Sequence, residues 1–437
     1  MHRVAWSSLL VLSGVVAAGA CGGSPPPALG DTQGPEAGAD VQAESGPGDA
    51  SLDQMPGDAG KPHDAAPDVV ESGPPFMMAA HPPWPQVPGN ALVVLHSMKL
   101  VTVVTSGDAN AADLFAFGDA LIASSWWSQI AQEYGLGTPS QNVHVTGAAM
   151  TANPTEAQML SYIEAAVAGT PAAAADGDTM YMLYLPPGID IVDPRGPNTN
   201  CQYYGGYHSL YDKSGDAWGV AQHCPVTGTQ LTDLQSVTII GSHEIVEGAS
   251  DPIPNNGWTL PALDTSAPWT QTPWIEAVYG EIGDLCAGTQ ITEGLYIYQR
   301  IWSNAAAALE GDPCVPTYTQ YAYDSMSAPQ GWYPVTSGGT VTIPVTGFSN
   351  EATTEWLAFA SIWKSSGPTF QVTLTSPTNE TIQGKSYPTL NNGTSGTVTV
   401  TAPAAASGSW AIVALESDPY VTGGDPYHTW VVGVYIP

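Results

Sequence analysis

The sequence predicts two folded domains in series, an α+β domain over residues 90–317, for which an α/β sandwich is one arrangement, and an all-β sandwich domain over residues 318–437. Two observations favour this fold class. Strand-like and helix-like segments alternate from residue 90 to about residue 250, which is the pattern of a layered domain. Beyond residue 318, short segments of alternating polarity recur at regular spacing, which is typical of an antiparallel β-sandwich.

Residues 1–21 have the pattern of a signal peptide. Arg3 precedes the apolar run Leu9–Ala18, and two small residues lead from this run to Cys21. The run is too short to span a bilayer comfortably as a helix. We therefore expect export from the cytoplasm, either to the cell envelope or to the extracellular space.

Cys21 resembles the lipid-modified cysteine of bacterial lipoproteins, although Ala18 stands where those proteins usually have Leu. The resemblance implies an N-terminal lipid anchor, and cleavage as an ordinary secreted protein is the alternative. Residues 22–89 are rich in Pro, Gly, Ala and Asp, so this segment cannot bury enough apolar surface to offset the entropy of ordering. It is predicted to be a disordered linker that holds the folded part away from the membrane.

The elements of the first domain are predicted from apolar periodicity and from helix-start signals. The capping box of Thr232 and Gln235 predicts a helix that runs through the motif described below. Asn153, followed by Pro154 and Glu156, predicts the start of another helix. The remaining predicted elements are a helix over residues 112–134 and strands over residues 91–95, 100–104, 142–146, 180–185 and 295–302.

The second domain is predicted from strand-like segments that are rich in Val, Thr and aromatic residues. They cover residues 340–345, 369–374, 397–400, 410–415 and 430–435. This domain contains no grouping of catalytic residue types, so we expect it to bind, space or stabilise.

The composition of the chain limits its partners. The formal net charge is −32, and there are only eight lysine and arginine residues. Such a surface repels nucleic acid and anionic lipid headgroups, so neither is expected as a partner. We expect a monomer that contacts a membrane only through its N-terminal anchor.

Four cysteines remain after Cys21, and an even number in an exported chain predicts two disulfides. We favour local pairing, of Cys201 with Cys224 and of Cys286 with Cys314, because each pair closes a loop-rich stretch dense in Gly, Pro and Tyr. The other two pairings remain open. A zinc site made of the four cysteines is disfavoured because the sequence has no C-x-x-C spacing.

The segment over residues 241–252 carries the residues most suited to chemistry. On a continuous helix, His243, Glu247 and Asp251 are at positions i, i+4 and i+8 and share one face. Two ligands one helical turn apart could hold a divalent cation, and Glu244 could deprotonate a water bound to it. The alternative is a structural network, in which these side chains only form hydrogen bonds with the loop that follows.

The sequence His-Glu-x-x-Glu at residues 243–247 resembles the H-E-x-x-H helix of zincin metalloproteases, with Glu247 in place of the second His. Glu281 and Asp284 resemble the downstream acids of the thermolysin-like branch, in which the Glu ligates the metal and the Asp orients a ligand histidine. Because a carboxylate is a harder ligand than an imidazole, calcium or manganese is an alternative to zinc.

The zincin resemblance implies a fold in which a sheet lies behind the active-site helix, and it implies a metal-dependent peptidase. Its substrate would be a peptide, with Glu244 as the general base. The implied metal site contains the ligands His243, Glu247 and Glu281, with Asp284 or Asp251 orienting the site.

A second resemblance, to plant phosphate-induced, exordium-like extracellular proteins, covers short segments between residues 91 and 317. These segments are Gly-Tyr-His at 206–208, Gln-His-Cys-Pro at 222–225, Asp-Pro at 251–252, Glu281 with Cys286, and Trp-Ser-Asn at 302–304. The resemblance implies a non-catalytic protein of the cell surface or wall, whose partner would be a cell-wall polymer.

Two further histidines, His208 and His223, lie in a polar region rich in Tyr. Either could supply the imidazole that the helix motif lacks, although solvent exposure or hydrogen bonding is the favoured interpretation for each. Several aromatic side chains could bind a sugar if they are exposed, and the Tyr residues could also stabilise an oxyanion, although packing around a disulfide loop is favoured for them. They are Tyr203, Tyr204, Tyr207, Trp258, Trp269 and Trp274.

Overall fold

The computed structural model describes residues 75–192, 205–211, 215–224, 231–262, 264, 266–278, 280–317, 322–382, 384–418 and 428–437. They form a mixed fold of helices and several β-sheets, which confirms the predicted class at this level, and residues 78–437 belong to one compact unit. The boundary at 317/318 stays a prediction. No helix in the described part is long and apolar enough to cross a lipid bilayer. The signal peptide, Cys21, Cys201, Tyr203, Tyr204 and residues 22–74 of the predicted linker lie outside the described residues. Residues 75–89 are described, and Trp84 and Val87 are buried in the core, so the prediction of a disordered linker is wrong for this part.

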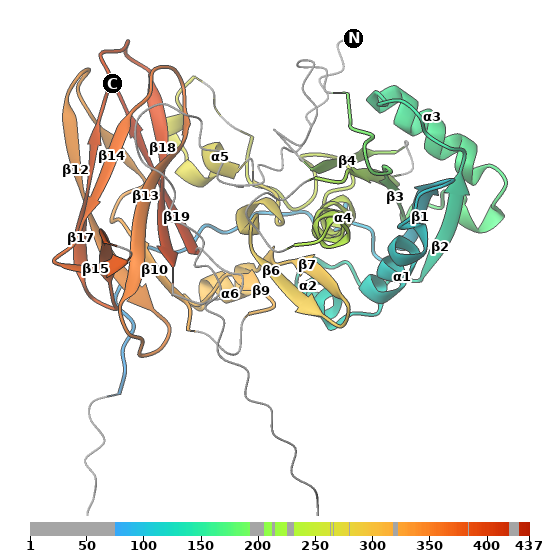
Figure 1. The fold of residues 1–437 in the computed structure, drawn as a ribbon, viewed down its shortest axis with the longest axis horizontal. Helices are drawn as coiled ribbons and strands as arrows, with labels where there is room; N and C mark the ends of the chain where they lie inside the picture. Colours follow the sequence, from blue (N-terminus) through green and yellow to red (C-terminus); the bar gives the residue numbers. More distant parts are fainter. Residues whose placement is uncertain are drawn as a thin grey trace, which may run out of the picture. The chain divides into compact units, whose positions relative to one another are not determined.

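A five-stranded sheet with the order β2-β1-β3-β5-β4 organises the first half of the described chain (Figure 1). β1 pairs in parallel with β2 and β3, β3 pairs in parallel with β5, and β4 is antiparallel to β5 at the sheet edge. The connections from β1 to β2 and from β2 to β3 run in opposite directions, so right-handed crossovers place α1 and α3 on opposite faces (Figure 1). The strands are β1 (Lys99–Thr105), β2 (Gln141–Gly147), β3 (Thr179–Tyr184), β4 (Gly206–Leu210) and β5 (Ala217–Ala221).

Two helices replace the single helix predicted over residues 112–134. α1 (Ala111–Ile122) ends before Ser124, and α2 (Ser125–Tyr134) begins after it. Ser124 has an extended backbone, and its hydroxyl accepts the N–H of Trp127, which caps a new helix instead of continuing the first.

The predicted start of the next helix is wrong by two residues. α3 (Glu156–Val167) is capped by Thr155, whose capping box with Gln158 replaces the predicted cap at Asn153. The Asn153 side chain instead accepts the N–H of Asp190. The strand predicted over residues 91–95 is also absent, because the chain forms a turn there.

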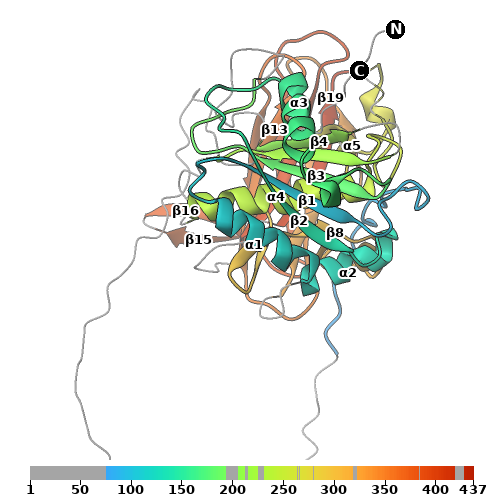
Figure 2. The ribbon, with the colours of Figure 1, turned by 90° about the vertical axis from the view of Figure 1, so that its right-hand side faces the viewer.

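α4 (Asp233–Ser250) confirms the helix predicted from Thr232 and Gln235, whose capping box is present. The helix contacts β3, β4 and β5 on one side and β7 on the other, and α1 and α4 lie on the same face of the sheet (Figure 2). Close approach to the sheet depends on Gly241, since a Cβ there would come 2.6 Å from Oη of Tyr184. Because α4 is covered on both sides, its polar side chains are buried along with its apolar ones.

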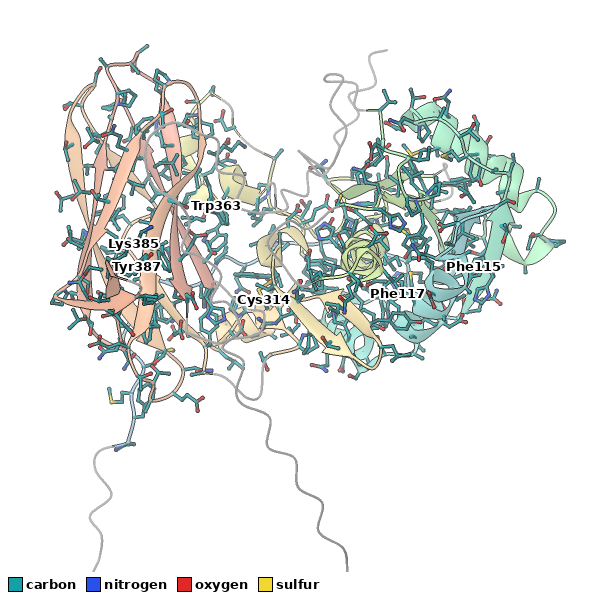
Figure 3. All side chains as sticks on the ribbon, in the orientation of Figure 1. Phe115, Phe117, Cys314, Trp363, Lys385 and Tyr387 are labelled. Carbon is teal, nitrogen blue, oxygen red and sulfur yellow. A yellow bond between two sulfur atoms is a disulfide. The ribbon has the colours of Figure 1, made fainter. Side chains whose placement is uncertain are left out.

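The chain after α4 folds into short elements that cover the helix. Phe117 of α1, labelled in Figure 3, stacks on Tyr298 of β7 with ring centroids 5.6 Å apart. Cys286 and Cys314 form the predicted disulfide. Cys224 is also disulfide-bonded, and its predicted pairing with Cys201 stays a prediction. The elements are α5 (Pro273–Val278), β6 (Gln290–Glu293), β7 (Tyr296–Gln299), β8 (Ile301–Trp302), α6 (Asn304–Ala308) and β9 (Cys314–Val315), with 3-10 turns η2 (Pro268–Thr270) and η3 (Asp284–Cys286).

The remaining strands form a four-stranded sheet, β10-β12-β17-β14, and a six-stranded sheet, β11-β19-β18-β13-β16-β15. All five segments predicted as strands in this region are strands, and five further strands were not predicted. The bounds are β10 (Asp324–Ser327), β11 (Trp332–Pro334), β12 (Thr340–Ser349), β13 (Trp356–Ser365), β14 (Gln371–Thr375), β15 (Thr378–Ile382), β16 (Lys385–Leu390), β17 (Ser395–Thr401), β18 (Trp410–Asp418) and β19 (His428–Tyr435).

Candidate metal centre

α4 carries three of the residues that the sequence places at a site. His243 and Glu247 are one turn apart, and Glu244 follows His243 directly. Each of these side chains is at most 1% exposed. A buried imidazole or carboxylate costs free energy unless it is hydrogen-bonded, neutralised by protonation or bound to a cation.

The segment after α5 brings two more acids to this helix. Asp284 begins η3, and Glu281 pairs with Thr259 in an isolated β-bridge. The backbone N–H groups of Gly283 and Asp284 both donate to Oε1 of Glu247, each at 3.1 Å. These two hydrogen bonds fix one oxygen of the carboxylate and leave Oε2 facing the histidines.

Gly283 lies against the site with no space for a side chain. A Cβ at this position would come 2.7 Å from Oε1 of Glu247 and 2.7 Å from Nδ1 of His243. The carbonyl of Gly283 accepts a hydrogen bond from Nε2 of Gln299 at 2.7 Å, and the N–H of Gln299 donates to Oγ of Ser242 at 2.9 Å. Gln299 thus ties the loop to α4. Gln299 was not predicted as a site residue, and its only signal in the sequence is a polar residue in an otherwise apolar strand.

His208 enters the same site from β4, the edge strand of the sheet. Its Nδ1 lies 3.7 Å from Oε2 of Glu244 and 3.7 Å from Oε2 of Glu247. Its Nε2 lies 3.5 Å from Oε2 of Glu281. The side chain is 0% exposed. Solvent exposure, one of the two favoured interpretations of His208, is therefore wrong, and the alternative that His208 supplies the imidazole that the helix motif lacks stays a prediction.

Six residues together form what we call the α4 cluster. Two triads within it bring their ligand atoms within 4.8 Å of one another, and both triads contain Glu247. The first is His243, Glu247 and Asp284, and the second is His208, Glu244 and Glu247. The α4 cluster consists of His208, His243, Glu244, Glu247, Glu281 and Asp284.

Burial and nearby negative charges raise the pKa values of two acids of the cluster. Burial raises the pKa of Glu247 well above its ordinary value, and the charges of Glu281 and Glu244 raise it further. Burial also raises the pKa of Asp284 well above its ordinary value, and the nearby carboxylates add to this effect. Without another source of positive charge, these acids tend to hold protons.

The pKa values of the two imidazoles shift in opposite directions. Burial lowers the pKa of His243 from its ordinary value. Burial acts in the same direction on His208, but the negative charges of Glu281, Glu247 and Glu244 outweigh it and raise the pKa of His208 to about 10. The negative charges of the cluster thus favour positive charge at His208.

Comparison with known proteins does not name this site. No protein-family model and no curated protein matches the chain. One similar solved structure is WR4, a member of the MSP family of C. elegans, with 10% identity and a TM-score of 0.18 over 26% of this chain and 100% of that chain. Another is a family 123 glycoside hydrolase from Clostridium perfringens, with 7% identity and a TM-score of 0.19 over 26% of this chain. This match covers 27% of the hydrolase chain.

Two predicted candidates lie away from the cluster. The carboxylate of Asp251, which caps the end of α4, accepts the N–H groups of Asn255, Asn256 and Gly257 and so closes the following turn. Nδ1 of His223 pairs with the carboxylate of Asp233. Neither residue belongs to the triads found among the described residues.

The aromatic candidates pack within the protein. Tyr207 is buried with its ring edge-on to Trp218. Trp274 is 5% exposed. Trp258 and Trp269 are half-buried: Nε1 of Trp258 donates to the carbonyl of Tyr134, and Trp269 stacks on Tyr435. These contacts weaken the case for an exposed sugar platform.

Proposed function

We propose that this protein is a metal-dependent hydrolase that binds zinc at the α4 cluster and acts on a peptide. The observation that carries the proposal is the convergence of four carboxylates and two imidazoles, all buried, on one helix of a sheet-backed domain. The ion-pair partners of Glu244, Glu247 and Asp284 are His208 and His243, and no lysine or arginine pairs with these three acids among the described residues. A divalent cation would supply the missing positive charge.

The donor atoms suit zinc. Oε2 of Glu244 and Oε2 of Glu247 are buried and have no hydrogen-bond partner in the described part of the chain. In the first triad, Nε2 of His243 lies 2.9 Å from Oε2 of Glu247 and 3.8 Å from Oδ1 of Asp284. These separations bracket the ~3.4 Å expected between two ligands of a tetrahedral zinc with bonds of about 2.0–2.2 Å. We assign the primary cation to this triad.

Glu244 and Glu247 of α4 have different roles in the proposed hydrolysis. Zinc, when bound, lowers the pKa of a water ligand to about 7 and polarises a carbonyl. Glu244 is the general base of the proposal, because it follows a ligand on the helix and its Oε2 is buried in the same cluster. Glu247 is held in orientation by the two backbone N–H groups on its Oε1.

The substrate class and the location are part of the same proposal. A peptide substrate is supported by the His-Glu-x-x-Glu spacing of residues 243–247 and by the sheet against which α4 packs, as the zincin resemblance implies. Export, with lipidation at Cys21, is supported by the pattern of residues 1–21.

Complete burial of the cluster favours a second candidate function. In it, the protein is a non-catalytic, exordium-like protein that binds a wall polymer, and the cluster only connects α4 to the η3 loop. This candidate gives the α4 cluster no metal. It predicts that His243→Ala lowers the melting temperature without changing the metal content.

The deciding experiment measures zinc by elemental mass spectrometry on the purified full chain, together with peptidase activity. We expect bound zinc in the wild type, loss of zinc in His243→Gln, and retention of zinc with loss of hydrolysis in Glu244→Gln. Glu164→Gln, an exposed site on α3, is the matched control. A wild type that binds no zinc, calcium or manganese would leave only the second candidate, and full activity in Glu244→Gln would remove that residue from the mechanism.

A further inference from the structure

We propose that the α4 cluster contains a second cation subsite, formed by His208, Glu244 and Glu247, and that its occupation inhibits hydrolysis. The subsite rests on the proposed function, because it shares Glu247 with the primary site at His243, Glu247 and Asp284. It takes a divalent cation that accepts imidazole and carboxylate ligands, for which zinc is the probe.

His208 is placed as a ligand of the second subsite would be placed. Both ring nitrogens are buried and neither has a hydrogen-bond partner among the described residues. Nδ1 lies 3.7 Å from an oxygen of Glu244 and 3.7 Å from an oxygen of Glu247. These separations are too long for hydrogen bonds but close to the ~3.4 Å between neighbouring ligands of a tetrahedral zinc.

The orientation of the imidazole also fits a ligand. Nε2 of His208 faces Oε2 of Glu281 at 3.5 Å, while Nδ1 faces α4. A histidine that binds a metal through one nitrogen commonly directs the other at a carboxylate, which sets the tautomer and the ring angle. Glu281 is therefore a positioning residue for His208, and this differs from its predicted role as a primary ligand.

The geometry favours two cations over one. The two triads do not merge into a single set of atoms within 4.8 Å in the described residues, so one small cation does not reach every ligand. Oε2 of Glu247 lies between them, 2.9 Å from Nε2 of His243 and 3.7 Å from Nδ1 of His208. A carboxylate in this position can bridge two ions, and paired ions in hydrolases lie about 3.5–4 Å apart.

The net charge of the site also favours two bound cations. The cluster holds four carboxylates, those of Glu244, Glu247, Glu281 and Asp284, and each is at most 5% exposed. One divalent cation leaves a net negative charge in a site shielded from water. Two divalent cations balance the four carboxylates with both imidazoles neutral, so the second binding event is favoured by electrostatics.

Inhibition follows from the identity of the ligands. Glu244 is the base in the proposed mechanism, and the lone pairs that would accept a proton from water are the ones that would bind the second cation. A chain with one cation is therefore active, and a chain with two cations is inhibited. The second cation would form coordinate bonds to His208, Glu244 and Glu247, any proton on these groups would pass to solvent, and no covalent bond of the protein or substrate would change.

The test is a zinc titration of the full chain by equilibrium dialysis, with elemental mass spectrometry as the readout. Calcium and physiological salt in the buffer suppress binding to the acidic surface. His208→Gln keeps a polar group facing Glu281 and removes the donor at the Nδ1 position. We expect two zinc ions per wild-type chain and one in His208→Gln and in Glu244→Gln. His223→Gln, a change in a histidine outside the cluster, should bind two.

The results distinguish failure of the second subsite from failure of the proposed function. Wild type that saturates at one zinc ion, with His208→Gln identical to it, refutes the second subsite and leaves the hydrolase proposal intact. Wild type that binds no zinc refutes both. If two ions bind and the count falls by one in His208→Gln, excess zinc should inhibit the wild type and should not inhibit the activity that His208→Gln retains. Inhibition that persists in His208→Gln would overturn the regulatory part.

Discussion

Replacement of Glu247 by Gln should change stability and zinc binding in opposite directions. Gln keeps the size of the side chain and an oxygen that can accept the N–H groups of Gly283 and Asp284. It removes one of several like charges from a fully buried cluster, and those charges together with burial already raise the pKa of Glu247. The metal-free variant should therefore be more stable than the metal-free wild type near neutral pH, because a charged group with a raised pKa destabilises the folded state there.

The size of the zinc effect follows from mass action. A ligand that binds only the folded state at one site stabilises it by about 2.7 kcal/mol when its free concentration is 100 times its dissociation constant. Wild type should gain at least this much under that condition. Glu247→Gln should gain almost nothing, because both triads contain Glu247.

The assay is equilibrium unfolding in urea, with and without a zinc buffer, followed by tryptophan fluorescence and by circular dichroism. Coincidence of the two probes checks that a single transition is being measured. Glu164→Gln should behave as wild type in both conditions. A zinc-induced gain in Glu247→Gln equal to that of the wild type would refute the assignment of Glu247, and a metal-free variant that is less stable than wild type would refute the argument from buried charge.

Three further changes test local parts of the structure. Gly283→Ala should cost about 1–3 kcal/mol by overpacking and should weaken zinc binding, whereas Gly169→Ala, where a Cβ meets open space, should do neither in the same assays. Ser124→Ala should cost about 1 kcal/mol in urea unfolding, because it removes the cap that starts α2. Burial raises the pKa of Glu416 despite its hydrogen bond from Ser361, so its stabilising contribution is present at low pH and is lost as pH rises through the folded-state pKa. Glu416→Gln should therefore raise the free energy of unfolding at about pH 8 and change it little at about pH 4. A similar change at both pH values would contradict the burial argument.

The elements predicted correctly from the sequence are those with strong local signals. The capping box at Thr232 places the start of α4, and alternating Val and Thr residues mark strands such as β17. The wrong or missing elements lie where the local sequence signal is weak. Ser124 stops a helix inside a continuous periodic pattern, because its hydroxyl satisfies the N–H of Trp127. β13 (Trp356–Ser365) was missed because its long mixed run of aromatic, aliphatic and polar residues has no clean alternation.

The candidate site was predictable only where its residues share one element. His243, Glu244 and Glu247 lie on α4, so their spacing alone predicts a common location. Glu281 and Asp284 could be proposed only through a family resemblance. Their approach depends on a loop held by the backbone bonds to Glu247 and by Gln299 of β7. These are contacts between distant segments, and no sequence period encodes them.

The position of His208 also depends on contacts between distant segments, which the sequence alone does not predict. It reaches α4 only because β4 pairs antiparallel with β5 and because α4 packs across both strands. Gly206 contributes, since a Cβ there would come 2.9 Å from Oε1 of Glu244. A second buried imidazole thus reaches α4 from a residue that lies 35 positions before His243 in the sequence.

The state of the buried polar atoms separates the two interpretations of the α4 cluster. A network that serves only structure is expected to satisfy its buried donors and acceptors, because each unsatisfied group costs about 1–3 kcal/mol and charged groups cost more. The carboxylate of Asp251 meets this expectation, because it accepts three backbone N–H groups. Unsatisfied buried atoms also occur elsewhere in the described residues, among them Nε1 of Trp218 and Nε1 of Trp356. In the cluster, Oε2 of Glu244 and both ring nitrogens of His208 are buried without hydrogen bonds in the described residues. What distinguishes the α4 cluster is that several such atoms lie together and are spaced as the ligands of one cation are spaced, and this supports the proposed cation over a purely structural network.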